Sequence, residues 1–541
     1  MALQRIAAQL SETVGALGAM RRAGLVSFGK LGHAAVTAKA ARAYGPLAGP
    51  IHAHAINGID RVALIDDLGS LTYPELDQQS NALARAWQEA GFDDTSVIAS
   101  ICRNSRWFVL VGLAAAKLGA RLVLMNTGFA APQLAAVAER EGVGVFVYDA
   151  EFAALAAALP ATTTKYVAWV EDPTDDPSLE HLIAGQPTNP LPPPAKAGVA
   201  TQLTSGTTGT PKGVPRAVVS PLASAQILDR IPLRTEQTMF AAAPVFHATG
   251  LGLMVMGFAL RNTIVLTRRF EARDALRIIA ENRCDTVIVI PTMLQRIVDL
   301  GPDVIAEYDT SALKVVFAAG SSISPDLSRK TSEYLGEVLY NLYGSTECAV
   351  VTVATPADLK RSPGTAGLAP VTCRVALYDD AGTKITERGT VGRIFAANGA
   401  SFAGYTDGRD KERIDGLLST GDLGHFDDNG MLFIEGRDDD MIVSGGENVY
   451  PIEIENLLAD RADVLDVCVI GVPDPEFGQR LRAFVVVAPG FEPDPQGLKD
   501  HVKAHLARYK VPRDVVFLDE LPRNTTGKLL RRVLVEMNEN P

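Results

Sequence analysis

A run of small hydroxyl residues and glycines, closed by a lysine, has the composition of a phosphate-binding loop. It consists of Thr204, Ser205, Gly206, Thr207, Thr208, Gly209, Thr210, Pro211, Lys212 and Gly213. Glycines let the backbone turn and approach a polyphosphate, whose oxygens accept hydrogen bonds from N–H and hydroxyl groups. A Walker A loop is excluded because Gly213, and not Ser or Thr, follows Lys212. A flexible surface loop would not explain Pro-Lys-Gly directly behind the glycines, so we predict a nucleotide phosphate site.

Two downstream segments supply other residue types that a nucleotide requires. In the segment Asn341-Leu342-Tyr343-Gly344-Ser345-Thr346-Glu347, Tyr343 offers an aromatic face for adenine and Thr346 a donor for a phosphate. Glu347 provides a hard oxygen ligand for Mg²⁺. In the Ser-Thr-Gly-Asp-Leu-Gly segment, Asp422 can accept two hydrogen bonds from a ribose with one carboxylate. Each segment taken alone would be read as an ordinary turn. The prediction of a nucleotide site therefore depends on the occurrence of these segments together in one chain.

Two further segments lie near the carboxyl end. Residues 436–439 read Gly-Arg-Asp-Asp and are followed at 444–448 by Ser-Gly-Gly-Glu-Asn. Residues 522–528 read Pro-Arg-Asn-Thr-Thr-Gly-Lys. A charged surface turn accounts for the first pair when it is taken alone. A solvated basic tail accounts for the last segment only in part, because it does not explain why Gly527 directly precedes Lys528.

All five segments occur in the order found in the adenylate-forming superfamily, which the chain resembles from residue 204 to residue 528. This superfamily contains acyl-CoA synthetases, peptide-synthetase adenylation domains and luciferases, and the chain is most similar to fatty-acyl-CoA synthetases. The resemblance implies two half-reactions: a carboxylate attacks the α-phosphate of ATP, and a thiol then attacks the acyl-adenylate. It also implies ATP, Mg²⁺ and coenzyme A as the small molecules that the protein uses.

The resemblance assigns roles to the matching residues. Lys528 would be the mobile catalytic lysine, assisted by Thr346 and by Glu347 as the Mg²⁺ ligand. Asp439 would be the hinge of a moving carboxyl-terminal domain, and Gly445 and Gly446 would line the approach of the thiol. The implied ATP site consists of Thr204, Ser205, Gly206, Thr207, Thr208, Gly209, Lys212, Gly320, Asn341, Tyr343, Gly344, Asp422 and Arg437.

The acid that is activated is predicted from the segment around His247. Amino-acid-activating relatives carry an Asp there to pair with the substrate ammonium, and His247 cannot supply a permanent negative charge. The residues that follow are mostly apolar and include Gly252, which is expected to line an acyl pocket together with His247. We therefore expect a medium- or long-chain fatty acid. The chain departs from the family pattern at Gly320-Ser321-Ser322-Ile323, which leaves the preferred acyl chain open.

The length and the net charge of the chain indicate how many domains it has and which ligands it can bind. With 541 residues it is too long for one ordinary core, so several domains are expected. A net charge of −12 argues against general nucleic-acid binding. An anionic substrate must therefore be held by local donors and magnesium.

Short apolar runs alternate with amphipathic stretches, which predicts an α/β fold. We expect a large amino-terminal domain of helix-flanked sheets with a small β-barrel-like part, followed by a small mobile α+β domain. The expected divisions are 1–50 for a basic amphipathic segment, 51–437 for the AMP-binding domain and 438–541 for the carboxyl-terminal domain. Residues 239–260 lack charge but are interrupted by glycines and a proline, so a strand, a turn and a core helix are expected there.

The amino-terminal segment allows two interpretations. Residues 1–50 contain six Arg or Lys residues and a single acid, and one helical face would carry Leu3, Ile6, Leu10, Val14 and Leu17. Such a helix either lies on an anionic membrane surface through residues 1–45 or packs on the protein body. The five scattered cysteines lack a Cys-x-x-Cys pair and fit a reducing cytosol, so a cytoplasmic location with or without membrane association is expected.

Two other functions stay open beside a fatty-acid–CoA ligase. An acyl-AMP ligase would deliver its adenylate to the pantetheine of a carrier protein. A catalytically silent relative at a membrane surface would keep only the fold, and the presence of Lys528, Glu347 and Asp422 weighs against it.

Overall fold

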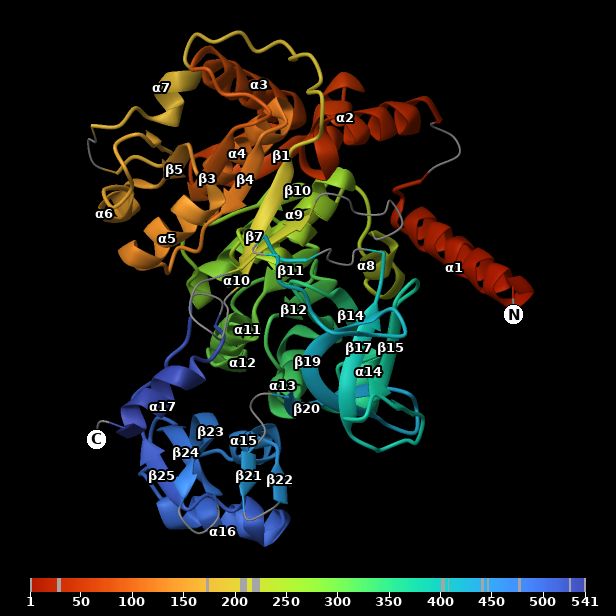
Figure 1. Cartoon of the computed structure of the whole chain (residues 1–541), viewed down its shortest axis with the longest axis vertical. Coiled ribbons are helices and arrows are strands. Elements are labelled where there is room, and N and C mark those ends of the chain that lie inside the picture. The colour runs from red at the N-terminus through yellow and green to blue at the C-terminus, as the bar shows by residue number, and fades with distance from the viewer. Residues whose placement is uncertain are drawn as a thin grey trace.

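The computed structural model describes residues 2–26, 31–171, 175–204, 212–216, 224–399, 404–406, 408–438, 442–444, 447–474, 478–524 and 527–539. Its strands form four sheets, and helices cover the eight-stranded sheet and the six-stranded sheet that contains β3 to β8 (Figure 1). This arrangement confirms the predicted α/β class.

The first sheet has a parallel centre. Its order is β14-β13-β12-β11-β9-β10-β1-β2, and only the edge strands β14 and β2 run antiparallel to their neighbours. The strands are β1 (Val62–Asp66), β2 (Gly69–Thr72), β9 (Thr238–Ala241), β10 (Thr263–Val265), β11 (Thr286–Val289), β12 (Val315–Ala319), β13 (Leu339–Ser345) and β14 (Ala349–Ala354). Helices that belong with this sheet are α9 (Ala248–Ala259), α10 (Ala272–Glu281), α11 (Pro291–Val298), α12 (Gly301–Ile305), α13 (Pro325–Leu335) and α14 (Pro356–Arg361).

The second sheet carries the phosphate-loop segment at its edge. Its order is β6-β5-β3-β4-β7-β8, with only β8 antiparallel. The strands are β3 (Val97–Ile101), β4 (Arg121–Leu124), β5 (Val145–Tyr148), β6 (Thr164–Val167), β7 (Val199–Thr204) and β8 (Lys212–Arg216). The helices around it are α3 (Tyr73–Glu89), α4 (Arg106–Leu118), α5 (Ala131–Glu141), α6 (Ala153–Ala156) and α7 (Leu179–Ile183).

Two further sheets follow along the chain. The third is antiparallel and contains β15 (Arg374–Tyr378), β16 (Lys384–Ile385), β17 (Gly392–Ala397), β18 (Arg413–Ile414), β19 (Leu417–Phe426) and β20 (Leu432–Arg437). The fourth contains β21 (Ile442–Ser444), β22 (Glu447–Val449), β23 (Val464–Asp474), β24 (Gly478–Val487) and β25 (Asp514–Phe517), with α15 (Pro451–Ala459), α16 (Pro495–His505) and α17 (Arg531–Glu539). The third sheet thus ends at Arg437, directly before the predicted division at residue 438, and that division itself stays a prediction.

The uncharged stretch 239–260 forms a strand and a helix, as predicted. It contains most of β9, a turn, and α9. Among the described residues, the helices are all too short or too polar to cross a membrane.

The amino-terminal helix packs through a different face from the one that its spacing indicates. In α1 (Ala2–Ala23), the small residues Ala16, Ala19 and Ala23 are buried, and the helix contacts α8 (Ser224–Arg230). In contrast, Val14 is 68% exposed and Leu17 is 47% exposed. The helix therefore packs on the protein body and also leaves part of its predicted apolar face uncovered.

The second helix, α2 (Leu31–Ile56), is kinked and firmly held. Gly45 adopts φ 78° and ψ −178° inside it, a conformation that favours glycine. Downstream of the kink, the ring of His52 contacts Asp77 of α3 at 3.2 Å, and Asp77 accepts a 2.7 Å hydrogen bond from the buried ammonium of Lys117 in α4. Three helices thus share one buried polar network, which fixes α2 against the second sheet.

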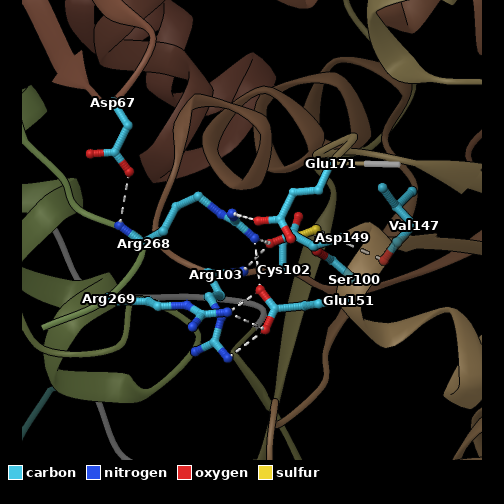
Figure 2. Close-up of polar contacts among 10 residues, drawn as sticks. All are labelled: Asp67, Ser100, Cys102, Arg103, Val147, Asp149, Glu151, Glu171, Arg268 and Arg269. Carbon is cyan, nitrogen blue, oxygen red and sulfur yellow. Dashed lines mark hydrogen bonds and ion pairs between the residues drawn. The ribbon is translucent and has the colours of Figure 1, made fainter. Parts of the chain in front are cut away.

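An ion network joins the two large sheets (Figure 2). Arg268, which follows β10, contacts Asp149 at 3.4 Å and Glu151 at 2.7 Å, beyond the end of β5. Arg103, which follows β3, donates its backbone N–H to Asp149 at 3.0 Å and its side chain to Glu151. The Arg268 guanidinium also lies 4.4 Å from the ring of Trp169. This network holds the carboxyl ends of β3 and β5 against the first sheet.

The burial of Asp149 predicts a pH dependence of stability. Burial raises the pKa of this carboxyl to about 6, although the Arg103 amide and Arg268 oppose the shift. Because the folded state then binds a proton that the unfolded chain releases, stability should rise as the pH falls from about 6 to about 4. Relative to Asp149→Asn, which cannot titrate, the wild type should gain at most about 3 kcal/mol over that range.

Urea unfolding followed by tryptophan fluorescence measures this difference. The three tryptophans, Trp87, Trp107 and Trp169, all belong to the segment around the second sheet, so the signal reports the relevant layer. A difference that does not change with pH, or that favours the wild type as the pH rises, would contradict the raised pKa.

Candidate active site

The parallel strands of the first sheet end at a common edge, where open α/β sheets bind ligands. A cavity of about 2680 Å³ lies there, far larger than the roughly 300–1,000 Å³ of ordinary small-molecule sites. It brings together residues of four of the five sequence segments and the predicted acyl pocket. These are Gly320, Asn341, Tyr343, Gly344, Thr346, Glu347, Asp422, Arg437, Lys528, His247 and Gly252.

Two glycines shape the backbone at this edge. Gly320, directly after β12, has φ +106°, a region that side-chain-bearing residues rarely adopt. At Gly344, a Cβ atom would lie 1.8 Å from the carbonyl oxygen of Ala349 in the paired strand β14. Only glycine therefore permits the tight β13–β14 hairpin, which presents Tyr343 and Glu347 to the cavity.

Asp422 lies at the centre of a charged group. Its Oδ2 accepts a 2.5 Å hydrogen bond from the Tyr343 hydroxyl, and its Oδ1 lies 3.5 Å from the guanidinium of Arg437. Asp422 and Arg437 are directly paired across β19 and β20. Burial raises the pKa of Asp422, whereas Tyr343 and the positive charges of Arg437, Lys411 and Lys528 oppose that shift. The carboxylate is thus enclosed by donors at the wall of the cavity.

Glu347 has the properties of a magnesium ligand. It is 9% exposed, and its Oε1 accepts a 2.7 Å hydrogen bond from the hydroxyl of Tyr405. Burial alone would raise the pKa of Glu347, but Tyr405 and the positive charge of Lys411 outweigh it and lower the pKa. Mg²⁺ usually takes one or two carboxylates together with substrate phosphates. A single ionised carboxylate fits that pattern, and among the described residues we find no cluster of three or more potential metal ligands.

Lys528 reaches the cavity from the carboxyl-terminal segment. Its backbone N–H donates to Oδ1 of Asn524 at 2.9 Å, which closes the turn that carries it. Gly527, with φ +71°, lies against α11 so closely that a Cβ atom would be 2.3 Å from Oγ1 of Thr292. The glycine before the lysine thus permits a backbone contact between segments that are distant in the sequence.

His247 is neutral and lines the cavity. Burial lowers the pKa of its imidazole to about 4. Its Nε2 is buried and has no hydrogen-bond partner in the described part of the chain. It can therefore exchange a hydrogen bond with a ligand but offers no permanent charge.

The loop before His247 is held by a residue that the motifs did not indicate. Asn104 follows β3 and is buried. Its Nδ2 donates to the carbonyl oxygens of Ala241 and Ala243 at 3.1 and 3.0 Å, and its Oδ1 accepts from the Val245 amide at 2.9 Å. Tyr405, Lys411 and Thr292 were also missed. The signal that could have indicated Asn104 was its place three residues after the end of a buried strand.

Part of the predicted site lies outside the described residues. This holds for Ser205, Gly206, Thr207, Thr208, Gly209, Asp439, Gly445 and Gly446, and for the side chains of Thr204 and Lys212. The backbone of Thr204 pairs with that of Lys212 across β7 and β8. The predicted phosphate loop therefore connects two adjacent antiparallel strands.

Comparisons with known proteins agree with this geometry. Residues 52–406 match the family model of the AMP-binding enzyme, and residues 453–528 match that of the AMP-binding enzyme C-terminal domain. The chain is 32% identical over 485 residues to the fatty acid–[acyl-carrier-protein] ligase ScoC of Streptomyces coeruleorubidus, which covers 86% of this chain and 91% of the relative. It is 30% identical over 480 residues to the long-chain-fatty-acid–CoA ligase FadD13 of Mycobacterium tuberculosis, with 86% and 93% covered.

A solved structure shares the fold across both parts. The o-succinylbenzoate CoA synthetase MenE of Bacillus subtilis, in complex with the acyl-adenylate intermediate OSB-AMP, superposes with a TM-score of 0.79 and 25% identity. The match covers 90% of this chain and 97% of that one. With both family models matched in order, the chain belongs to the adenylate-forming ligases of the AMP-binding enzyme family.

Proposed function

We propose that the protein activates a fatty acid with ATP to an acyl-adenylate and then transfers the acyl group to coenzyme A. The observation that carries this proposal is one cavity that is lined both by charged residues and by apolar residues of α9. Glu347, Asp422 and Lys528 all line it, so nucleotide and acid would share one space. The similarity to ScoC and FadD13 supports a fatty acid as the substrate.

In the first half-reaction, a carboxylate oxygen of the acid attacks the α-phosphorus of ATP. A new P–O bond forms while the bond to the β-phosphate oxygen breaks, and pyrophosphate leaves. The Lys528 ammonium stabilises the negative charge that builds between carboxylate and phosphate. Asp422 holds the ribose hydroxyls, and Thr346 donates to the α-phosphate. Magnesium, held by Glu347 and the phosphates, would neutralise phosphate charge.

In the second half-reaction, the thiol of coenzyme A attacks the adenylate carbonyl. The C–S bond forms, the bond between the carbonyl carbon and the phosphate oxygen breaks, and AMP leaves as the thiol proton is released. We infer that the carboxyl-terminal segment turns about Asp439, withdraws Lys528 and brings Gly445 and Gly446 to the cavity. One site would then serve both reactions.

A carrier protein is the second candidate acceptor, because ScoC is named as a ligase of the acyl-carrier protein. The assay that separates the two acceptors supplies the protein with ATP, Mg²⁺, a panel of fatty acids, and either coenzyme A or a pantetheine-bearing carrier protein. Acyl-CoA formation supports the proposal. Adenylate that accumulates despite added coenzyme A supports the carrier protein, and no acid-dependent pyrophosphate release would contradict both.

Lys528→Ala should separate the two half-reactions. We expect acid-dependent pyrophosphate release to fall at least a hundredfold, since a preorganised charge at the reacting oxygens is lost. Thioester formation from supplied synthetic acyl-adenylate should stay within a few-fold of the wild type. Lys503→Ala, in the exposed part of α16, is the matched control. Equal losses in both half-reactions would rule out the assigned role.

Gly527→Ala tests the contact that brings Lys528 to the cavity. The added methyl group would collide with Thr292, so adenylation should drop by tenfold or more, which corresponds to about 1.4 kcal/mol. Gly490→Ala is a strict control, because Gly490 also has positive φ (+87°) but nothing within 4 Å of its added Cβ atom. Pyrophosphate release by both variants, measured beside their thermal unfolding, distinguishes a blocked approach from simple backbone strain. Similar losses in the two variants would argue against the proposed contact.

We also propose that α1 makes peripheral contact with anionic membranes. Val14 and Leu17 are exposed, and Arg21 and Arg22 lie in the last turn of the helix. The double variant Val14→Asp and Leu17→Asp should sediment severalfold less with vesicles of anionic lipid and keep the wild-type turnover of a water-soluble short acid. Sedimentation equal to that of the wild type would refute this contact.

A further inference from the structure

The segment 404–406 lies where three of the four sheets meet. The ring of Tyr405 packs against a small apolar cluster whose members include Val214 of β8, Val351 of β14 and Ala396 of β17. These strands belong to the second, the first and the third sheet, respectively. Tyr405 also lines the large cavity. The five sequence segments do not include this place, so its part in the site comes from the structure.

The hydroxyl of Tyr405 contacts the predicted magnesium ligand. It donates to Oε1 of Glu347 at 2.7 Å. The backbone after Glu347 is held separately, because Nδ2 of Asn398 donates to the carbonyl oxygens of Cys348 and Val350 at 2.6 Å each. A hydrogen bond from a residue outside the ligand set fixes the orientation of a ligating carboxylate. Tyr405 is placed to act in this way on Glu347.

The next residue, Thr406, contacts the strand that leaves the predicted phosphate loop. Its backbone N–H donates to the carbonyl oxygen of Gly213 at 3.0 Å. Gly213 directly follows Lys212 and lies in β8. A Cβ atom added at Gly213 would lie 2.6 Å from Oγ1 of Thr406 and 3.1 Å from Oε1 of Glu141. The missing side chain at position 213 thus makes room for the threonine.

Glu141 anchors Thr406 to the second sheet. It is the last residue of α5 and 4% exposed, and its Oε1 accepts a 3.1 Å hydrogen bond from Oγ1 of Thr406. Arg121, the first residue of β4, donates to its Oε2 at 2.7 Å, and Arg140 donates to its Oε1 at 2.9 Å. Burial alone would raise the pKa of Glu141, but the two guanidiniums and the threonine hydroxyl outweigh it and lower the pKa. A buried carboxylate held by two guanidiniums is a fixed acceptor for the threonine.

We propose that Tyr405 and Thr406 are positioning residues that hold the magnesium ligand and the phosphate loop in register. Tyr405 orients the carboxylate of Glu347, and Thr406, anchored by Glu141, fixes the strand behind the loop. Mg²⁺ is bound by a carboxylate and by substrate phosphates together, so both must be placed relative to each other before ATP binds. This inference rests on the proposed function for its nucleotide, ATP, and is independent of the acid and of the thiol.

Tyr405→Phe removes the hydroxyl and keeps the ring. Equilibrium binding of ATP is measured without any acid, once with Mg²⁺ and once with EDTA. The wild type should bind ATP more tightly with Mg²⁺, and the variant should lose about tenfold of that gain while its affinity in EDTA stays within about twofold of the wild type. Tyr378→Phe is the matched control, because Tyr378 of β15 donates to Oδ2 of Asp415 at 2.8 Å and does not line the cavity. An equal gain in Tyr405→Phe and the wild type, or no gain in the wild type, overturns the role of Tyr405.

Thr406→Val removes the hydroxyl that Glu141 accepts and keeps the shape of the side chain. We expect the affinity for ATP to fall about fivefold with Mg²⁺ and with EDTA alike, because the strand behind the phosphate loop loses its anchor. Thr406→Ser keeps the hydroxyl and should bind ATP as the wild type does. Equal losses in the two Thr406 variants, or no loss in either, overturn the role of Thr406.

The outcome for this inference is distinguishable from that for the proposed function. If the wild type binds ATP and the variants behave as expected, but no fatty acid is converted to acyl-CoA, the inference stands and the proposed acid or acceptor is wrong. If acyl-CoA forms and the variants bind ATP as the wild type does, the inference is wrong and the proposed function stands. If the wild type binds no ATP, both are wrong.

Discussion

The contact between Gly527 and Thr292 is the constraint on which the composition of the cavity depends. The turn that carries Lys528 belongs to a segment that follows the fourth sheet, whereas Thr292 lies in the first turn of α11, a helix of the first sheet. Only a backbone without a side chain can approach to this distance, since a methyl group would lie 2.3 Å from the threonine hydroxyl. This approach places the Lys528 charge close enough to oppose the raised pKa of Asp422.

Local charge overrides the overall charge of the protein in this cavity. A net charge of −12 would repel a nucleoside triphosphate, but salt screens exposed charges beyond about 8–10 Å. The groups that oppose the raised pKa of Asp422 are cations and a phenol: Arg437, Lys411, Lys528 and Tyr343. Lys411 also lowers the pKa of Glu347. Positive groups around two buried carboxylates allow an anion to enter a negatively charged protein.

The nucleotide segments could be predicted from the sequence because their chemistry is local. The β13–β14 hairpin places Tyr343, Thr346 and Glu347 within a few residues of one another, so a short pattern identifies them. The α/β class could also be predicted, since continuous apolar runs such as those that form β11 and β12 mark parallel strands.

Residues that act over long sequence separations escaped prediction. Asn104 binds carbonyl oxygens of Ala241 and Ala243, and backbone acceptors carry no residue-specific signal. Similarly, the spacing of apolar residues in α1 favoured the face with Val14 and Leu17, but the helix packs through alanines. Small residues allow close helix packing, whereas hydrophobicity patterns give most weight to large ones.

The residues assigned to the nucleotide belong to segments shared with the family, whereas the residues that would contact the rest of the acid do not. The substrate is therefore harder to derive from the sequence than the reaction. ScoC, FadD13 and MenE are named for different acids or acceptors, although this chain aligns with most of each. The groups around Asp422 and Glu347 contact the nucleotide in our proposal, and they are indifferent to what lies beyond the carboxylate. Discrimination between acids must then come from the walls farther along the cavity. Residues of α2 also line this cavity, and the position of α2 is fixed by the buried His52–Asp77–Lys117 network while its shape is set by Gly45. This helix carries none of the nucleotide segments, so its kink and its side chains are separate in the sequence from the residues to which we assign adenylation.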